Sequence, residues 1–152
     1  YHKRYPAEFE RFTPVCRTNQ LELCSKQEID NAYDNTILYT DYFLSRVIAL
    51  LKVYDHQFET AMLYVSDHGE SLGERGLYLH GMPYMIAPQE QTHVAAIIWL
   101  GARFDETTVG ALKARRKQRY SHDNLFHTIL GLVEVGDALY DPTLDILRGS
   151  RF

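Results

Sequence analysis

The sequence predicts an α/β fold in which helices pack on a mostly parallel sheet. Three observations favour this class. Apolar residues recur at helical spacing from about residue 26 to residue 53. Two short apolar segments, 60–66 and 93–101, are bounded by polar residues and are typical of strands buried on both faces. A second helical pattern follows Ser121, which completes the order helix, strand, loop, strand, helix.

Length and charge narrow the class of protein. The 152 residues suffice for one domain with a core, and contents of 45% hydrophobic and 24% charged residues are ordinary for a globular protein. The net charge of −4 argues against nucleic acid as a partner, because such proteins need a basic surface. No apolar run approaches the roughly 20 residues that span a bilayer, and no signal peptide opens the chain. Because the first residue is Tyr1, we expect a piece of a longer polypeptide or a processed product.

The first 24 residues are expected to form an ordered loop, because Pro6, Pro14 and mixed polar residues interrupt any regular period. Cys16 and Cys24 lie in this loop. Three interpretations of these cysteines are open: two unrelated small residues, a pair of zinc ligands, or a disulfide. The zinc pair is disfavoured because the chain has no C-x-x-C spacing and no second cysteine pair. We favour the disulfide, which requires an oxidising compartment outside the cytosol.

The long helix is expected to begin with a capping box. Ser25 is followed by Glu28, so each side chain can satisfy a backbone N–H at the helix start. Apolar residues such as Ile37, Val47 and Leu51 then follow near helical spacing. The pattern predicts one helix over residues 26–53.

Residues 67–92, between the two predicted strands, form a long segment rich in glycine and proline. Long ordered loops in compact domains are usually functional. Asp67 and His68 come directly after the first strand, and sites in parallel sheets form beyond the carboxyl ends of strands. An acid at the end of a buried strand also needs a partner, because an unpaired buried charge is costly. The sequence therefore predicts a site at this pair.

A carboxylate and a neutral imidazole are good ligands for Zn²⁺. Adjacent side chains of a strand point to opposite faces, so Asp67 and His68 can reach one ion only where the backbone turns. Gly69 permits such a turn. Glu70 and Glu74 are candidates for orienting the ligands or for accepting hydrogen bonds from the loop.

Two further histidines, His80 and His93, are candidates for a second metal or for contact with an anionic substrate. The alternative for each is a hydrogen-bonded or surface histidine. The pair Asp67 and His68 does not complete a catalytic zinc site, which usually takes about three protein ligands and an open position. Ser66 and Ser71 flank the pair without an activation motif, and we interpret them as ordinary loop serines. The remaining parts of the site are expected from other residues or another chain.

Four segments of the chain occur in the order seen in bacterial phosphoethanolamine transferases: YDNTILYTDYFL, YVSDHGESLGERGLYLHGMPY, APQEQTHVAAIIWL and YSHDNLFHTILGL. The opening KRYPAEFERFTPVC and the C-x7-C spacing also resemble this family, which modifies lipid A and includes the colistin-resistance proteins. The resemblance covers nearly the whole chain. It implies an alkaline-phosphatase/sulfatase-like α/β fold, a disulfide-bonded periplasmic catalytic domain and an N-terminal membrane domain.

The resemblance also implies a reaction. Members of this family transfer phosphoethanolamine from phosphatidylethanolamine to lipid A or a related envelope glycan through a phospho-threonine intermediate. Their zinc is held by a glutamate, the threonine nucleophile, an aspartate and a histidine, and the last two match Asp67 and His68. His80 matches a histidine that lies by the substrate phosphate or a second zinc.

The glutamate and the threonine have no match in this chain. We therefore expect residues 1–152 to be the C-terminal portion of the catalytic domain, inactive alone, with the membrane domain and the first half of the catalytic domain absent. The full-length protein is expected at the periplasmic face of the inner membrane. Ala95 stands where relatives usually have proline. The alternatives are a sulfatase- or phosphodiesterase-type hydrolase of the same superfamily, or a non-catalytic zinc-binding module.

Overall fold

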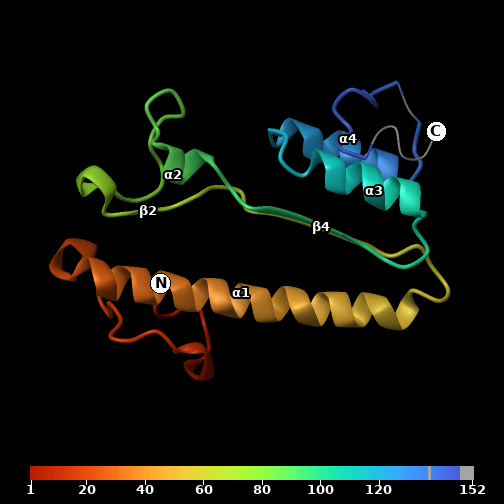
Figure 1. Cartoon of the computed structure of the whole chain (residues 1–152). Coiled ribbons are helices and arrows are strands. Elements are labelled where there is room, and N and C mark those ends of the chain that lie inside the picture. The colour runs from red at the N-terminus through yellow and green to blue at the C-terminus, as the bar shows by residue number, and fades with distance from the viewer. Residues whose placement is uncertain (137, 148–152) are drawn as a thin grey trace. The chain divides into compact units, whose positions relative to one another are not determined.

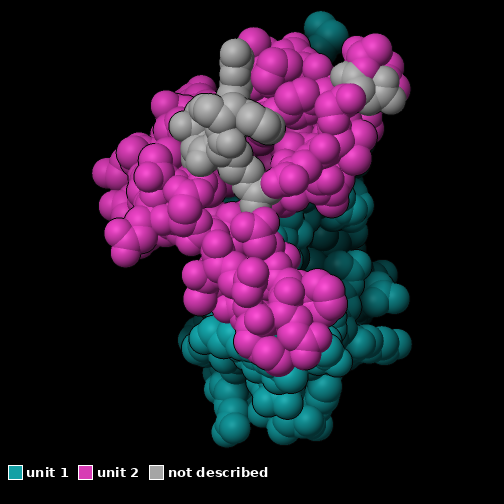
Figure 2. Space-filling model, turned by 90° about the vertical axis from the view of Figure 1, so that its right-hand side faces the viewer, with its two compact units in different colours: residues 1–54, 61–99 teal, residues 55–60, 100–152 magenta. Residues whose placement is uncertain are grey.

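The structure is a computed structural model that describes residues 1–136 and 138–147. The chain divides into two compact units, which Figure 2 distinguishes by colour. Unit 1 comprises Tyr1–Tyr54 and Ala61–Trp99, and unit 2 comprises Asp55–Thr60 and Leu100–Phe152. None of the helices in the described part of the chain is both long and apolar enough to cross a bilayer.

Unit 1 is dominated by the 29-residue helix α1, Lys26–Tyr54 (Figure 1). Its predicted capping box is confirmed. The backbone N–H of Ser25 donates to Glu28 Oε2 at 2.8 Å, and the backbone N–H of Glu28 donates to Ser25 Oγ at 3.3 Å. The helix buries Ile29 and Ala32 in its first turns, whereas many apolar side chains in its second half are exposed.

Residues 1–24 form an ordered loop, as predicted, with two short 3₁₀ helices, η1 (Ala7–Phe9) and η2 (Leu21–Leu23). The fully buried Asn35 of α1 holds this loop. Its Oδ1 accepts the backbone N–H groups of Arg11 and Phe12 at 2.8 and 3.0 Å. Its Nδ2 donates to the Phe12 carbonyl at 2.9 Å and to the Tyr5 hydroxyl at 3.4 Å. One amide thus satisfies several backbone groups that a loop would otherwise leave unpaired.

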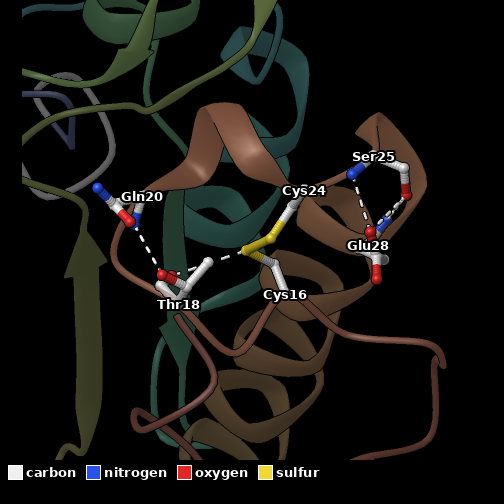
Figure 3. Close-up of a disulfide and its surroundings, with 6 residues drawn as sticks. All are labelled: Cys16, Thr18, Gln20, Cys24, Ser25 and Glu28. Carbon is white, nitrogen blue, oxygen red and sulfur yellow. Dashed lines mark hydrogen bonds between the residues drawn. A yellow bond between two sulfur atoms is a disulfide. The ribbon is translucent and has the colours of Figure 1, made fainter.

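The predicted disulfide is present between Cys16 and Cys24, with their Cα atoms 5.7 Å apart (Figure 3). Cys16 packs with Leu21 and Ile29 in a buried apolar cluster, which we call the disulfide cluster. The partly buried residues packed against it are Tyr1, Cys24, Leu72 and Tyr78. A loop this short stabilises the native state by about 2–3 kcal/mol in the chain-entropy model. The cluster joins the N-terminal loop, the start of α1 and the segment after the first strand.

The two predicted strands exist and pair with each other as β1 (Ala61–Val65) and β4 (Ala96–Leu100). The backbone N–H of Ser66 donates to the Ala95 carbonyl, and that of Gly101 donates to the Thr60 carbonyl. The end of each strand therefore lies opposite the start of the other, which is an antiparallel arrangement.

A second antiparallel pair joins β2 (Ser71–Leu72) to β3 (Tyr78–Leu79), with Ser71 opposite Leu79. The expected mostly parallel sheet is thus not seen among the described residues. Burial on both faces was also wrong for β1 and β4, where only Met62 is buried. An apolar run indicates a strand, but it fixes neither the direction of its neighbour nor what covers its faces.

Unit 2 contains the helices α3 (Glu106–Arg115) and α4 (Asp123–Leu132). Asp105 caps α3, since its carboxylate accepts the backbone N–H of Thr108 at 2.9 Å and the Thr108 hydroxyl at 2.6 Å. The helix expected after Ser121 is confirmed as α4, although its N-cap residue is His122. Ser121 Oγ accepts the backbone N–H of Asp123 at 3.3 Å, so the serine still satisfies one group at this helix start.

Candidate metal centre

The candidate site lies in unit 1, in the segment 67–92 that follows β1. This segment was predicted as a long loop, and the structure shows that it contains short elements. Besides β2 and β3, it holds the 3₁₀ helix η3 (Glu74–Gly76) and the four-residue helix α2 (Gln89–Thr92). These elements bring residues from both ends of the segment together.

Gly69 is required for a reason that the sequence did not reveal. Its backbone N–H donates to the Gln91 carbonyl at 3.0 Å, so the turn after β1 lies directly against α2. A Cβ atom at this position would lie 2.0 Å from the Glu90 carbonyl oxygen. Space, rather than the backbone torsional freedom of glycine, therefore excludes a side chain here.

Gln91 is the buried brace of the segment. Its Nε2 donates to Ser71 Oγ at 2.9 Å, and its Oε1 accepts the backbone N–H of Met82 at 3.4 Å. Together with the Gly69 bond, these contacts tie α2 to the turn after β1, to β2 and to the chain after β3. No pattern in the sequence indicates this role, because a glutamine in a polar loop is ordinarily a surface residue.

Asp67 and His68 lie side by side in the turn after β1. Asp67 Oδ2 and His68 Nε2 are 3.8 Å apart, and the backbone N–H of His68 donates to Asp67 Oδ1 at 3.1 Å. His68 Nδ1 lies 3.0 Å from the Gly69 carbonyl oxygen. Because a carbonyl can only accept, Nδ1 carries the proton, and in the neutral ring Nε2 then keeps its lone pair.

The structure also brings His80 to this pair. The ring centroids of His68 and His80 are 3.6 Å apart, with their planes tilted by 31°. His80 Nδ1 lies 3.2 Å from Glu70 Oε1, and the Glu70 side chain is 7% exposed. Ligand atoms of His68, Glu70 and His80 all lie within 4.8 Å of one another.

The donor set fits zinc. Two ligands of a tetrahedral zinc ion are about 3.4 Å apart when each bond is about 2.1 Å long. The 3.8 Å separation of Asp67 Oδ2 and His68 Nε2 is close to this value. This pair combines an imidazole nitrogen with a carboxylate oxygen, and both are ordinary zinc ligands. The Asp67 side chain is 89% exposed, so its outer oxygen is accessible to an ion.

Glu74 takes the second of its two predicted roles and accepts a hydrogen bond from the loop. Its Oε2 accepts the backbone N–H of Leu72 at 2.6 Å, and its Oε1 lies 3.7 Å from Lys26 Nζ at the start of α1. Burial alone would raise the pKa of Glu74, but backbone N–H groups and Lys26 outweigh it and lower that pKa. Glu74 therefore holds the β2–β3 turn and carries a negative charge at neutral pH.

His93 is not part of the His68, Glu70 and His80 group. It is exposed, follows α2, and its Nδ1 lies 3.3 Å from Gln89 Nε2 of that helix. Its role at a second metal or at the substrate stays a prediction.

Comparison with known proteins gives the family. The family model described as Sulfatase matches residues 1–135. The chain belongs to the sulfatase family. This sulfatase-family chain is 46% identical, over 155 aligned residues, to phosphoethanolamine transferase EptA of Salmonella typhimurium. The alignment covers 99% of the chain and 28% of that relative.

Solved structures agree with this match. The sulfatase-family chain aligns with the C-terminal periplasmic domain of phosphoethanolamine transferase EptC from Campylobacter jejuni at a TM-score of 0.90 and 50% identity, covering 97% of the chain and 47% of that domain. It also aligns with the integral membrane protein lipooligosaccharide phosphoethanolamine transferase A from Neisseria meningitidis. There the TM-score is 0.92 and the identity 41%, with 99% of the chain and 29% of that protein covered.

These matches confirm the resemblance to phosphoethanolamine transferases and the sulfatase-like α/β class. The part of the relatives that the chain matches belongs to a periplasmic domain. The chain spans between a quarter and a third of the full-length relatives and about half of the solved periplasmic domain.

Proposed function

We propose that this chain is part of a phosphoethanolamine transferase and contributes Asp67 and His68 as zinc ligands. The observation that carries the proposal is their spacing of 3.8 Å, with the His68 Nε2 lone pair available. The similarity to EptA of Salmonella typhimurium, which spans 99% of the chain, supports the same reading. Bound zinc would supply charge neutralisation and lower the pKa of a hydroxyl at the site.

The donor would be phosphatidylethanolamine and the acceptor lipid A or a related envelope glycan, at the periplasmic face of the inner membrane. Transfer would pass through a phospho-threonine, with the threonine and a glutamate ligand supplied outside residues 1–152. Residues 1–152 alone are then expected to be inactive. This division of the site agrees with the ligand count, since Asp67 and His68 supply two of about three protein ligands that a catalytic zinc site takes.

The chain's own residues have separate tasks in this scheme. Asp67 contributes a negative charge that offsets part of the charge of the ion, and His68 contributes a neutral nitrogen donor. His80, whose ring lies against His68, is placed to contact a substrate phosphoryl group or a second metal. His93 is a weaker candidate for the same task, because it lies outside the His68, Glu70 and His80 group.

Because residues 1–152 alone are expected to be inactive, the test expresses the full-length protein that contains them in a bacterium deprived of its own phosphoethanolamine transferases. Mass spectrometry of lipid A then measures phosphoethanolamine addition. We expect addition with the natural sequence, a loss of at least about 100-fold with His68→Ala, and no change with His122→Gln, which alters a histidine of unit 2. Full activity of His68→Ala would overturn the assignment of this ligand. The absence of transfer from the well-expressed, unsubstituted full-length protein would overturn the proposed activity.

A further inference from the structure

Glu70 lies between two side chains from distant parts of unit 1. The Tyr1 hydroxyl donates to Glu70 Oε2 at 3.2 Å, and His80 Nδ1 lies 3.2 Å from Glu70 Oε1. Because a carboxylate only accepts, His80 Nδ1 must carry the proton in this contact. The neutral ring of His80 therefore keeps its lone pair on Nε2, as His68 does.

The same contacts argue against Glu70 as a metal ligand. Each of its oxygens already has a hydrogen-bond donor, and its side chain is 7% exposed. Asp67, in contrast, has a side chain that is 89% exposed. A buried carboxylate that holds the Nδ1–H of a histidine is the usual outer partner of an imidazole whose other nitrogen binds a ligand.

Tyr1 is itself held firmly. Its ring packs against the disulfide cluster and meets the Tyr33 ring edge-on, with the centroids 5.4 Å apart and the planes at 80°. Burial, followed by the negative charge of Glu70, raises the pKa of the Tyr1 hydroxyl, so this group stays protonated and able to donate. A fixed donor on Oε2 prevents the carboxylate from rotating, which keeps Oε1 facing His80.

We propose that Tyr1 is a positioning residue for His80, acting through Glu70. The tyrosine hydroxyl fixes the carboxylate, and the carboxylate fixes the imidazole tautomer that exposes the Nε2 lone pair. Of the two tasks proposed for His80, this tautomer suits the binding of a second metal, because a lone pair cannot donate to a phosphoryl oxygen. This inference deepens the proposed function and rests on it for the task of His80. The hydrogen-bonded chain also connects the disulfide cluster to the candidate metal centre, since the Tyr1 ring packs on that cluster.

The test uses ¹⁵N NMR of the histidine rings in the metal-free protein near pH 8, where neutral imidazole predominates and the ¹⁵N shifts report the tautomer. In the natural sequence we expect His80 to be protonated on Nδ1. Tyr1→Phe removes only the hydroxyl and should move His80 toward a mixture of both tautomers. Tyr33→Phe is the matched control, because it removes a hydroxyl from the neighbouring ring and leaves the Glu70 contacts in place; it should have no effect.

Two variants of Glu70 separate positioning from folding. Glu70→Gln keeps a carbonyl oxygen that can accept from Nδ1 and should preserve the tautomer, whereas Glu70→Ala should lose it. Zinc titration by calorimetry gives a second readout, in which Tyr1→Phe should weaken binding about tenfold, as loss of an outer-shell partner does. Near-UV circular dichroism identifies any variant that has lost its packing. The comparison then rests on Tyr1→Phe and Glu70→Gln, each of which changes a single functional group.

An unchanged His80 tautomer in folded Tyr1→Phe would overturn the positioning role while leaving the proposed transferase function intact. The expected tautomer changes, together with a full-length protein that neither binds zinc nor transfers phosphoethanolamine, would support the positioning role and overturn the proposed function. The two failures are therefore distinguishable.

Discussion

The imidazole rings of His68 and His80 lie with their centroids 3.6 Å apart, although β2, η3 and β3 separate them along the chain. The β2–β3 pair folds the segment back on itself, so that His80, which follows β3, returns to His68 in the turn after β1. Each ring has its Nδ1 occupied by a different acceptor, the Gly69 carbonyl for His68 and the Glu70 carboxylate for His80. Two nitrogen donors therefore face one small region with their tautomers already set.

Removal of His68 should abolish most of the zinc affinity of the protein. We expect His68→Ala to weaken zinc binding by more than the roughly 10–100-fold that loss of an outer-shell partner costs, because it deletes a ligand outright. Isothermal calorimetry at constant pH measures this directly. His122→Gln serves as the control and should bind zinc as the natural sequence does. Equal zinc affinity in His68→Ala would exclude this histidine from the metal site.

A methyl group at position 69 should destabilise unit 1. The Cβ of Gly69→Ala would lie 2.0 Å from the Glu90 carbonyl oxygen, so α2 or the turn after β1 must shift. We expect a loss of about 1–3 kcal/mol in the free energy of unfolding, as for other overpacked sites, measured by urea titration.

The matched control is Gly110→Ala, because nothing lies within 4 Å of a Cβ at that position in α3. It should stabilise the protein by up to about 1 kcal/mol through helix propensity. Comparable stability of Gly69→Ala and the natural sequence would show that the close approach to Glu90 is relaxed at little cost.

Local signals in the sequence predicted α1 and the disulfide correctly. The capping box of Ser25 and Glu28 lies within one turn, and the short spacing of Cys16 and Cys24 suits closure of a small loop. Both features depend on neighbours in the chain, which is why a single sequence reveals them. The placement of Asp67 and His68 after β1 is of the same kind.

Features that depend on distant residues were missed. No pattern indicated that Gln91 would brace Ser71 or that Tyr1 would reach Glu70, since both contacts join segments far apart in sequence. The helix α3 was missed for another reason. Its sequence ETTVGALKAR contains threonine, valine and glycine, which are weak helix formers, and its start depends on the cap by Asp105.

The capping box should give α1 a pH-dependent contribution to stability. The backbone N–H and then the hydroxyl of Ser25 lower the pKa of Glu28 by donating to its carboxylate. The charged form is thus favoured in the native state. The contribution is fully present above the ordinary pKa of a glutamate and is lost as the pH falls through the lowered native value.

Glu28→Gln should therefore be less stable than the natural sequence at neutral pH and should lose less stability on acidification. Urea titrations between about pH 7 and pH 3 check both statements. Glu22→Gln, which removes a carboxylate from η2, provides the comparison and should keep the natural acid-side slope. Parallel pH profiles for Glu28→Gln and the natural sequence would contradict a native-state role for the charge.

Asn35 should be intolerant of aspartate even though the two side chains have the same shape. Its Oδ1 accepts from Arg11 and Phe12, and an aspartate can keep those bonds. Its Nδ2 donates to the Phe12 carbonyl at 2.9 Å, where an aspartate would place a second oxygen against an oxygen. Since this site is fully buried, we expect a loss of about 1–3 kcal/mol or more in the free energy of unfolding.

Hydrogen exchange distinguishes the two halves of this amide. In Asn35→Asp the backbone N–H groups of Arg11 and Phe12 should stay protected from hydrogen exchange until the protein unfolds globally, because the carboxylate still accepts their hydrogen bonds. In Asn35→Ala both should exchange faster, because their acceptor is gone. Natural stability of Asn35→Asp in urea would show that the donated bonds to Phe12 and Tyr5 contribute nothing, and that the loop is held by the accepted bonds alone.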